Sequence, residues 1–360
     1  MQKNVRLNPT RDSNLELYRI IVMLLIIAHH YVVNSGLLQL MEQRTLSSSS
    51  IFLYLAGMWG KTGINCFVLI TGYFMCKSQI TIRKFLKLLF EIEFYKISLY
   101  LIFIISGYAN FSITECIKAF LPITNIHDGF VSCFLVFYLF IPFLNILINN
   151  LNKKLHLLLI GLCIFTYTIL GSIPKIDVTM NYVSWFCVLY FIAAYIRNYG
   201  CFSIKKEQWK WFTLISIFLS IISVMCILKC NQTFNKSIFP YYFVSDCNSI
   251  FAVTTAICSF MFFKNLKLKN SKIINLVSRS TFGVLLIHAN SNIMRQWLWK
   301  DTFKNMSYFS SEYLWIHFLV TIITIYIICT FIDYLRIVYI ETPFFKMIDS
   351  KLNLKIFSNV

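Results

Sequence analysis

The sequence predicts an all-α integral membrane protein that crosses the bilayer about ten times. Of its 360 residues, 58% are hydrophobic and only 13% are charged, whereas a soluble domain has about 25% charged residues. The mean hydropathy is +0.68, and apolar runs near the length of about 20 residues that a spanning helix needs recur from one end to the other. The low charge extends along the whole chain, which indicates one membrane domain over residues 1–360.

Ten apolar runs are the predicted spans. The last-but-one run carries Arg279 and His288, and the fifth is short; we find no internal repeat and no separate soluble domain. No pattern typical of a cleaved signal peptide precedes the first run, so we expect it to remain as a membrane anchor. In order, the predicted spans are residues 15–34, 51–76, 86–107, 130–149, 155–173, 183–199, 211–229, 241–263, 273–294 and 313–336.

The loops between these runs predict the orientation. If the N-terminus is cytoplasmic, most of the 33 lysines and arginines fall in cytoplasmic segments, as the positive-inside rule requires. The C-terminus is then also cytoplasmic. The net charge of +18 has the same explanation, so we expect membrane lipid and no nucleic acid among the partners.

The first span, "SNLELYRIIVMLLIIAHHYVVNSG", carries an unusual set of polar residues. "SNLE" predicts a capping box with Ser13 as the N-cap and Glu16 three residues later. In an α-helix His30 lies within about 20° of the direction of Arg19 and about 16 Å further along the axis, and Glu16 lies about 40° from His30. His29 points about 80° away. Glu16, Arg19 and His30 therefore form one polar stripe.

A polar stripe on a spanning helix is expected to face protein or a cavity rather than lipid. A neutral imidazole is an effective base near pH 7, so His30 is a candidate to take a proton from an attacking hydroxyl, or to be acylated itself. The alternatives are a helix cap for Glu16, an interfacial position for Arg19 and a helix–helix hydrogen bond for His30.

Several segments carry a family resemblance. Arg19 and His30 are separated by ten residues after the leader "SNLELYR", "NCFVLITGYFMCKS" ends the second span, and "YIETPFF" follows the last span. "FVSCFLVFYLFIPFLN" and "STFGVLLIHA" add weaker matches. Together these segments resemble the acyltransferase 3 family of integral-membrane O-acyltransferases of surface glycans, over almost the full length.

Two departures from the family pattern stand out. Many members have Asp where Glu16 stands, and often two arginines where this chain has Lys84 and Lys87 after the second span. Lysine makes no planar bidentate contact with phosphate. Positive charge on cytoplasmic loops is an alternative explanation for these lysines and for Arg83.

The resemblance implies an O-acetyltransferase in a bacterial plasma membrane. The donor would be acetyl-CoA, a substrate that enters from the cytoplasm and not a bound cofactor. The acceptor would be a hydroxyl of a cell-surface polysaccharide or a lipid-linked glycan precursor. His30 would be the base, Arg19 would position the donor with support from Glu16, and the basic cluster Arg83, Lys84 and Lys87 would contact CoA phosphates.

Four further residues are candidates for acceptor binding or support. They are Lys61, Asn65, His288 and Glu341. Each has a plainer interpretation, such as an interfacial lysine, a packed histidine, or an ion pair of Glu341 with Arg336 or Lys346. No H-E-x-x-H motif or other metal-binding spacing occurs, so we expect no metal.

Other functions remain open at this point. The acyl group could be another one, such as succinyl, or the chain could be a glycan exporter or flippase. A third possibility is a family member with only a structural role. A flippase needs a wide polar cavity shared by many helices, whereas here the charge inside the membrane is concentrated in the first helix.

Overall fold

The computed structural model describes residues 12–43, 46–200 and 204–351, and their regular secondary structure is all helical, with no strand among them. The all-α prediction is confirmed for these residues. The predicted domain over 1–360 also includes residues 1–11, 44–45, 201–203 and 352–360, which lie outside the described residues. Six helical stretches in the described part are long and apolar enough to cross a membrane: Ser13–Val33, Ser48–Met75, Phe130–Asn150, Lys153–Ser172, Gln208–Phe234 and Leu314–Asp349.

Three of these six stretches are single α-helices, and three are composite. In Lys153–Ser172 the α-helix ends at Cys163 and continues into a π-helical and a 3-10 segment. Ser48–Met75 is divided between Gly57 and Gly60, and the last stretch continues through a π-helical turn into a terminal helix. Pro142 lies inside the third. The bounds are α1 Ser13–Val33, α3 Ser48–Gly57, α4 Gly60–Met75, α7 Phe130–Asn150, α8 Lys153–Cys163, α10 Gln208–Phe234, α15 Leu314–Leu335 and α16 Thr342–Lys351.

The other four predicted spans are also helical, but in different forms. Helix α5 (Ile82–Ile105) carries several charged residues and α9 is Tyr182–Tyr199, while α11 (Ile250–Asn265) begins well inside the predicted run 241–263. The run 273–294 is broken into α12 (Lys272–Val277), a 3-10 turn and α13 (Thr281–His288). The short helices are α2 (Leu37–Gln43), α6 (Ile113–Phe120) and α14 (Asn292–Arg295). The ten-span count and the orientation stay predictions.

Polar side chains fix several helix starts. The Thr81, Asn152 and Asn181 side chains accept from backbone N–H groups in the first turns of α5, α8 and α9. The predicted capping box is wrong, because Asp12 occupies the N-cap of α1 and Ser13 is already helical. The Ser13 hydroxyl instead donates to Asn275 Oδ1 at 2.9 Å, which ties α1 to α12.

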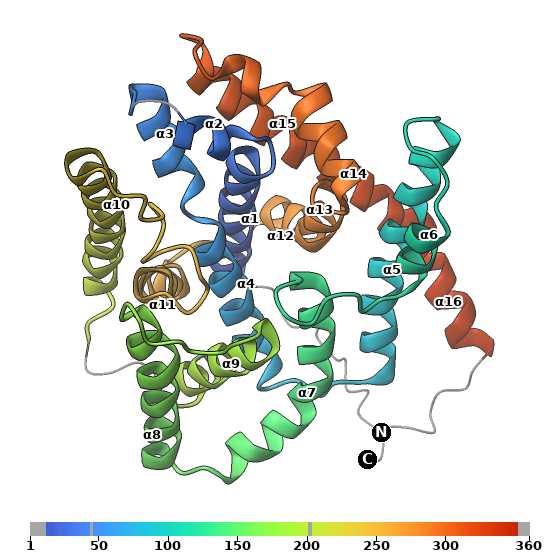
Figure 1. Ribbon diagram of the computed structural model, residues 1–360. Helices are drawn as coiled ribbons and strands as arrows, with labels where there is room; N and C mark the ends of the chain where they lie inside the picture. The colour runs from blue at the N-terminus through green and yellow to red at the C-terminus, as the bar shows by residue number, and fades with distance from the viewer. Residues whose placement is uncertain (1–11, 44–45, 201–203, 352–360) are drawn as a thin grey trace.

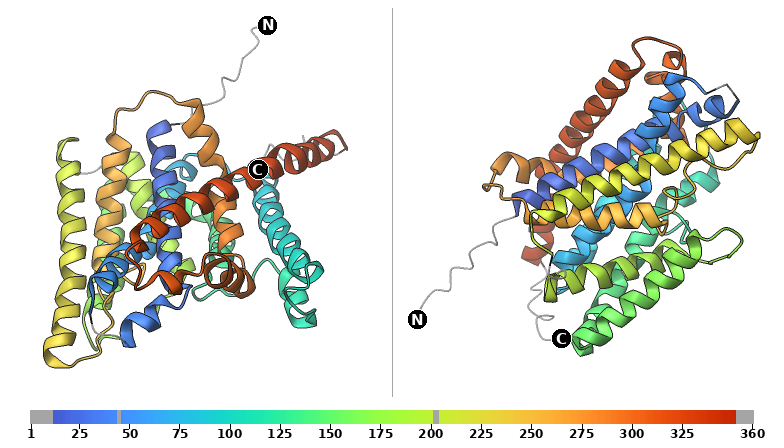
Figure 2. Two further views of the ribbon diagram at one scale, coloured as in Figure 1. Left: turned by 90° about the horizontal axis from the view of Figure 1, so that it is seen from above. Right: turned by 90° about the vertical axis from the view of Figure 1, so that its left-hand side faces the viewer.

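Helices α1 and α4 occupy the centre of the molecule (Figure 1). Helix α1 contacts α3, α4, α11, α12, α13 and α15, and α4 also packs against α9 and α11. Helix α10 covers the outer side of α11 at one edge, and α5 and α16 lie at the other (Figure 1). In Figure 2, α1, α10 and α11 run in similar directions while α16 lies across them. Elements from both halves of the sequence therefore surround α1.

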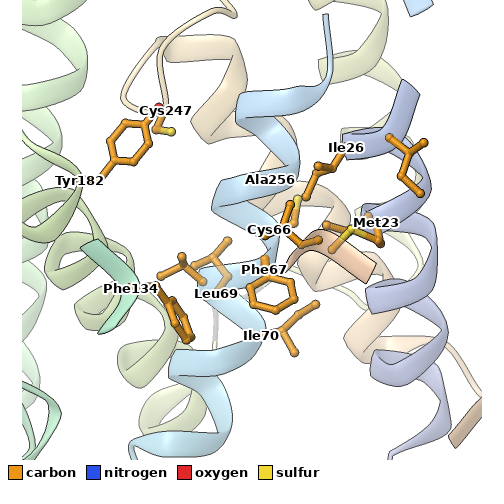
Figure 3. Packing of buried hydrophobic residues seen from close by; sticks show 14 of the residues in the cluster. Met23, Ile26, Cys66, Phe67, Leu69, Ile70, Phe134, Tyr182, Cys247 and Ala256 are labelled. Carbon is orange, nitrogen blue, oxygen red and sulfur yellow. The ribbon is translucent and has the colours of Figure 1, made fainter. Parts of the chain in front are cut away.

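The core around α4 fixes its position relative to α1 and α7 (Figure 3). Cys66, Leu69 and Ile70 are buried, and the Phe67 ring lies 6.1 Å from the ring of Phe134. Tyr18 on α1 donates a hydrogen bond to Cys66 Sγ at 2.8 Å. Because lipid is as apolar as these side chains, close packing and such hydrogen bonds hold membrane helices together.

A buried ion network joins α5 to the end of α15. Arg336 bonds Asp333 Oδ1 at 2.9 Å, Glu91 Oε1 at 3.0 Å and Glu341 Oε2 at 2.7 Å, and Tyr95 donates to the same Asp333 oxygen at 2.8 Å. Helix α13 passes so close that a Cβ on its Gly283 would lie 2.2 Å from this oxygen. The network therefore joins α5 to α15, and α13 packs directly against it.

Arg336→Met is expected to destabilise the protein strongly. The substitution leaves buried carboxylates without their cation, and breaking a buried ion pair from one side costs about 3–5 kcal/mol. The thermal unfolding midpoint in detergent measures the loss. The exposed Lys346 gives the matched control Lys346→Met, and equal midpoints for the two variants would contradict the structural role of the network.

Candidate functional site

A cavity of about 390 Å³ lies against the C-terminal part of α1. Its lining includes His29 and His30 from α1, Lys61 from the start of α4, Lys96 from α5, Tyr182 from the start of α9 and Arg295 from α14. The volume falls within the range of about 300–1,000 Å³ typical of ligand sites. Helices from both halves of the sequence therefore meet around the two adjacent histidines.

His30 forms a hydrogen-bonded pair with His288. Its Nδ1 lies 3.0 Å from Nε2 of His288, whose Nδ1 lies 2.6 Å from the Val284 carbonyl oxygen. A carbonyl only accepts, so His288 carries its proton on Nδ1, and in the neutral ring its Nε2 is an acceptor. His30 must then donate from Nδ1. The proton of neutral His30 is therefore on Nδ1, and its Nε2 holds a free lone pair.

His288 has the position of an orienting residue. It is fully buried, with 0% exposure, and its ring lies edge-on to Trp299. A hydrogen-bonding partner on one ring nitrogen sets which tautomer a histidine adopts and how the ring is oriented. The pair therefore prepares His30 Nε2 to accept a proton.

His29 also lines the cavity, although helix geometry points it away from the polar stripe. Its Nδ1 lies 2.6 Å from the Gly57 carbonyl oxygen, so this nitrogen is the donor and Nε2 is free. A Cβ at position 60 would lie 2.2 Å from Cγ of His29. Glycine at position 60 therefore provides the space that the His29 ring occupies, which the spacing of the histidines did not indicate.

Arg19 and Glu16 form an ion pair at 3.2 Å but do not line the cavity. Eleven residues of helix place Arg19 about 16 Å from His30 along the axis. The stripe is therefore present on α1, and only its His30 end reaches the cavity.

Lys61 and Asn65 have different surroundings. Lys61 lines the cavity and donates a hydrogen bond to the Tyr182 hydroxyl. Asn65 is fully buried, with its Nδ2 2.6 Å from the Cys247 carbonyl oxygen and its Oδ1 2.9 Å from Trp185 Nε1. The structure brings Lys61 to the cavity, while Asn65 ties α4 to α9.

The basic cluster at the start of α5 is separate from the cavity. Arg83 pairs with Asp349, Lys84 Nζ lies 2.6 Å from Ser78 Oγ, and Lys87 Nζ lies 3.4 Å from Glu341 Oε1. None of the three lines the cavity, and neither does Glu341. Glu341 belongs to the Arg336 network.

The sequence did not indicate that Lys96, Tyr182 and Arg295 line the cavity. Each is distant from His30 along the chain and shares no spacing with it, so no local pattern could have placed them there. Arg295 gave the one usable signal: it is a basic residue only seven positions after His288.

A family model described as an acyltransferase domain matches residues 12–334. The matched region contains α1 with both histidines, every cavity residue named above, and almost all of α15. No curated protein and no solved structure matches the chain. The apolar helices and this match identify a multi-pass membrane protein, and the chain belongs to the acyltransferase 3 family of acyltransferases.

Proposed function

We propose that the protein transfers an acetyl group from acetyl-CoA to a hydroxyl of a cell-surface polysaccharide or a lipid-linked glycan precursor. The observation that carries this proposal is the free Nε2 of His30 at the cavity, with the tautomer set by His288. Acyl transfer to a hydroxyl needs a base of this kind, because the neutral hydroxyl is a weak nucleophile.

In the proposed reaction His30 Nε2 takes the proton of the acceptor hydroxyl as the oxygen attacks the thioester carbonyl. His288 Nε2 accepts the hydrogen bond of the resulting imidazolium at Nδ1. When the tetrahedral intermediate collapses, the carbon–sulfur bond breaks and the thiolate of CoA leaves with the proton from Nε2. A covalent route, in which His30 Nε2 is acylated first, uses the same lone pair.

The proposed membrane arrangement has ten spans with both termini in the cytoplasm of a bacterial cell. It places Arg83, Lys84 and Lys87 on the cytoplasmic side, where they would contact CoA phosphates. His30, near the C-terminal end of α1, then lies in the outer half of the membrane. Arg19, between these levels, would balance the donor's charge together with Glu16, and the acceptor would approach from the outer side near Lys61.

The proposal is tested with purified protein in liposomes, [14C]acetyl-CoA and the host's own glycan. We expect label in the glycan and release of free CoA, both dependent on the protein. [14C]Succinyl-CoA in a parallel reaction tests the other acyl group. Glycan that crosses the liposome membrane without being labelled by either donor would refute the proposal in favour of an exporter.

Gly60→Ala is expected to reduce acetyl transfer about tenfold to a hundredfold. The new methyl group occupies the place of the His29 ring, and a displacement of about 1 Å at a reacting site can cost about a hundredfold. Gly161→Ala is the matched control, because a Cβ there has nothing within 4 Å. Initial rates at equal protein concentration measure both. Equal rates for Gly60→Ala and Gly161→Ala would show that displacing the His29 ring does not affect acetyl transfer.

A further inference from the structure

Arg295 is a cavity cation that uses only a small part of its hydrogen-bonding capacity. It ends the short helix α14, and its Nη1 lies 3.3 Å from Asn292 Oδ1. Its Nε is buried and has no hydrogen-bond partner, and no carboxylate in the described ranges forms an ion pair with it. A guanidinium has five N–H donors, so most of its hydrogen-bonding capacity is open to a ligand.

The other cations around the cavity are already engaged. Lys61 donates to the Tyr182 hydroxyl, and Lys96 donates to the Leu121 carbonyl oxygen. The acidic residue of the lining, Asp128, accepts from Asn125 Nδ2 at 2.7 Å. Arg295 is therefore the lining cation best able to receive a new anion.

The charge of Arg295 is also close to the two paired histidines. Arg295 lines the same cavity as His30 and follows His288 by seven residues, and within the described residues no hydrogen bond joins it to either histidine. A partly buried cation with open donors is costly unless an anion arrives to meet it. The position beside the proposed base suggests that this anion develops during the reaction.

We propose that Arg295 is a catalytic residue that stabilises the oxyanion of the tetrahedral intermediate. The inference rests on the proposed acyl transfer. When the acceptor oxygen bonds to the thioester carbon, the carbonyl electron pair moves onto its oxygen, and the N–H groups of Arg295 donate to that oxygen. When the carbon–sulfur bond breaks, the pair returns to re-form the carbonyl group, and Arg295 is again free.

If Arg295 bound an anionic group of the acceptor instead of the oxyanion, its removal would change KM rather than kcat. A carboxylate or phosphate of the acceptor is negative before and during the reaction, so losing its contact raises KM and leaves kcat unchanged. An oxyanion exists only along the reaction path, so losing its contact lowers kcat. Hydrolysis of acetyl-CoA, with water as the acceptor, isolates the second case because no glycan anion is present.

The test compares Arg295→Gln, Arg295→Ala and Arg295→Lys in liposomes, for glycan transfer and for acetyl-CoA hydrolysis. We expect Arg295→Gln to lower kcat about a hundredfold in both reactions, the scale for one oxyanion donor, with KM nearly unchanged. Arg295→Lys should retain more activity than Arg295→Gln, and added guanidinium should partly restore Arg295→Ala. The exposed Lys300 supplies the charge-matched control Lys300→Gln.

Two results would overturn the assignment. One is a raised KM for the glycan with kcat and hydrolysis unchanged, which identifies a binding site for an anionic acceptor. The other is a loss of activity that follows a lowered unfolding midpoint and shows no rescue by guanidinium, which identifies a structural role. If the wild type catalyses neither transfer nor hydrolysis, the proposed function itself fails.

Discussion

His30→Ala is expected to reduce acetyl transfer by about 10²–10⁴-fold, the contribution of a positioned general base. The variant removes the Nε2 lone pair of a histidine that lines the cavity. Initial rates with [14C]acetyl-CoA at saturating acceptor and equal expression measure the effect. KM should change little, because the proton transfer occurs only along the reaction path.

Two other histidine variants serve as comparisons for His30→Ala. His29→Ala should lose less activity than His30→Ala, since His29 bonds a backbone carbonyl and has no imidazole partner to support a positive charge. His127→Ala alters an imidazole that is 81% exposed in a loop and should match the wild type. Full transfer by His30→Ala would remove His30 as the base.

His288→Phe is expected to reduce transfer by about 10³-fold with the His30 side chain intact. Without the acceptor at His288 Nε2, no hydrogen bond favours the tautomer of His30 that carries its proton on Nδ1. In the other tautomer the proton is on Nε2, which then has no lone pair to accept the proton of the hydroxyl. Loss of the tautomer-setting partner of a catalytic histidine costs about 10⁴-fold in serine proteases. Steady-state kcat measures the loss.

His288→Gln provides the matched comparison. A glutamine oxygen can accept the same hydrogen bond, so this variant should retain more activity than His288→Phe. Both variants remove the buried imidazole, so they share any cost in stability, which the unfolding midpoint reports. If Phe and Gln at position 288 gave equal rates, the hydrogen bond to His30 would not be the reason for the loss.

Local periodicity predicted one side of the site well. The stripe on α1 follows from 3.6 residues per turn, and His30 does lie at the cavity. The same geometry set His29 apart, but a cavity lined from several helices is wider than one helical face. His288, the partner of His30, is 258 residues away, and no spacing rule reaches across that distance.

The errors at helix ends and breaks have physical causes as well. The N-cap of α1 is Asp12 and not Ser13, whose hydroxyl donates to Asn275 on another helix. The apolar run 241–263 predicted one span, but the chain turns before α11 begins at Ile250. Asp246, Asn248 and Ser249 are typical turn residues and mark this turn. The network around Arg336 depends on Glu91 and Asp333 from different helices, whose charges looked unrelated in the sequence.

The most direct test of the account is a double-mutant cycle on His30 and His288. It compares kcat for the wild type, His30→Ala, His288→Phe and the double variant in the same liposomes. If His288 acts only by setting the tautomer of His30, the double variant should be no slower than His30→Ala alone. Losses that multiply would show that the two histidines act independently, and would contradict the paired-imidazole mechanism.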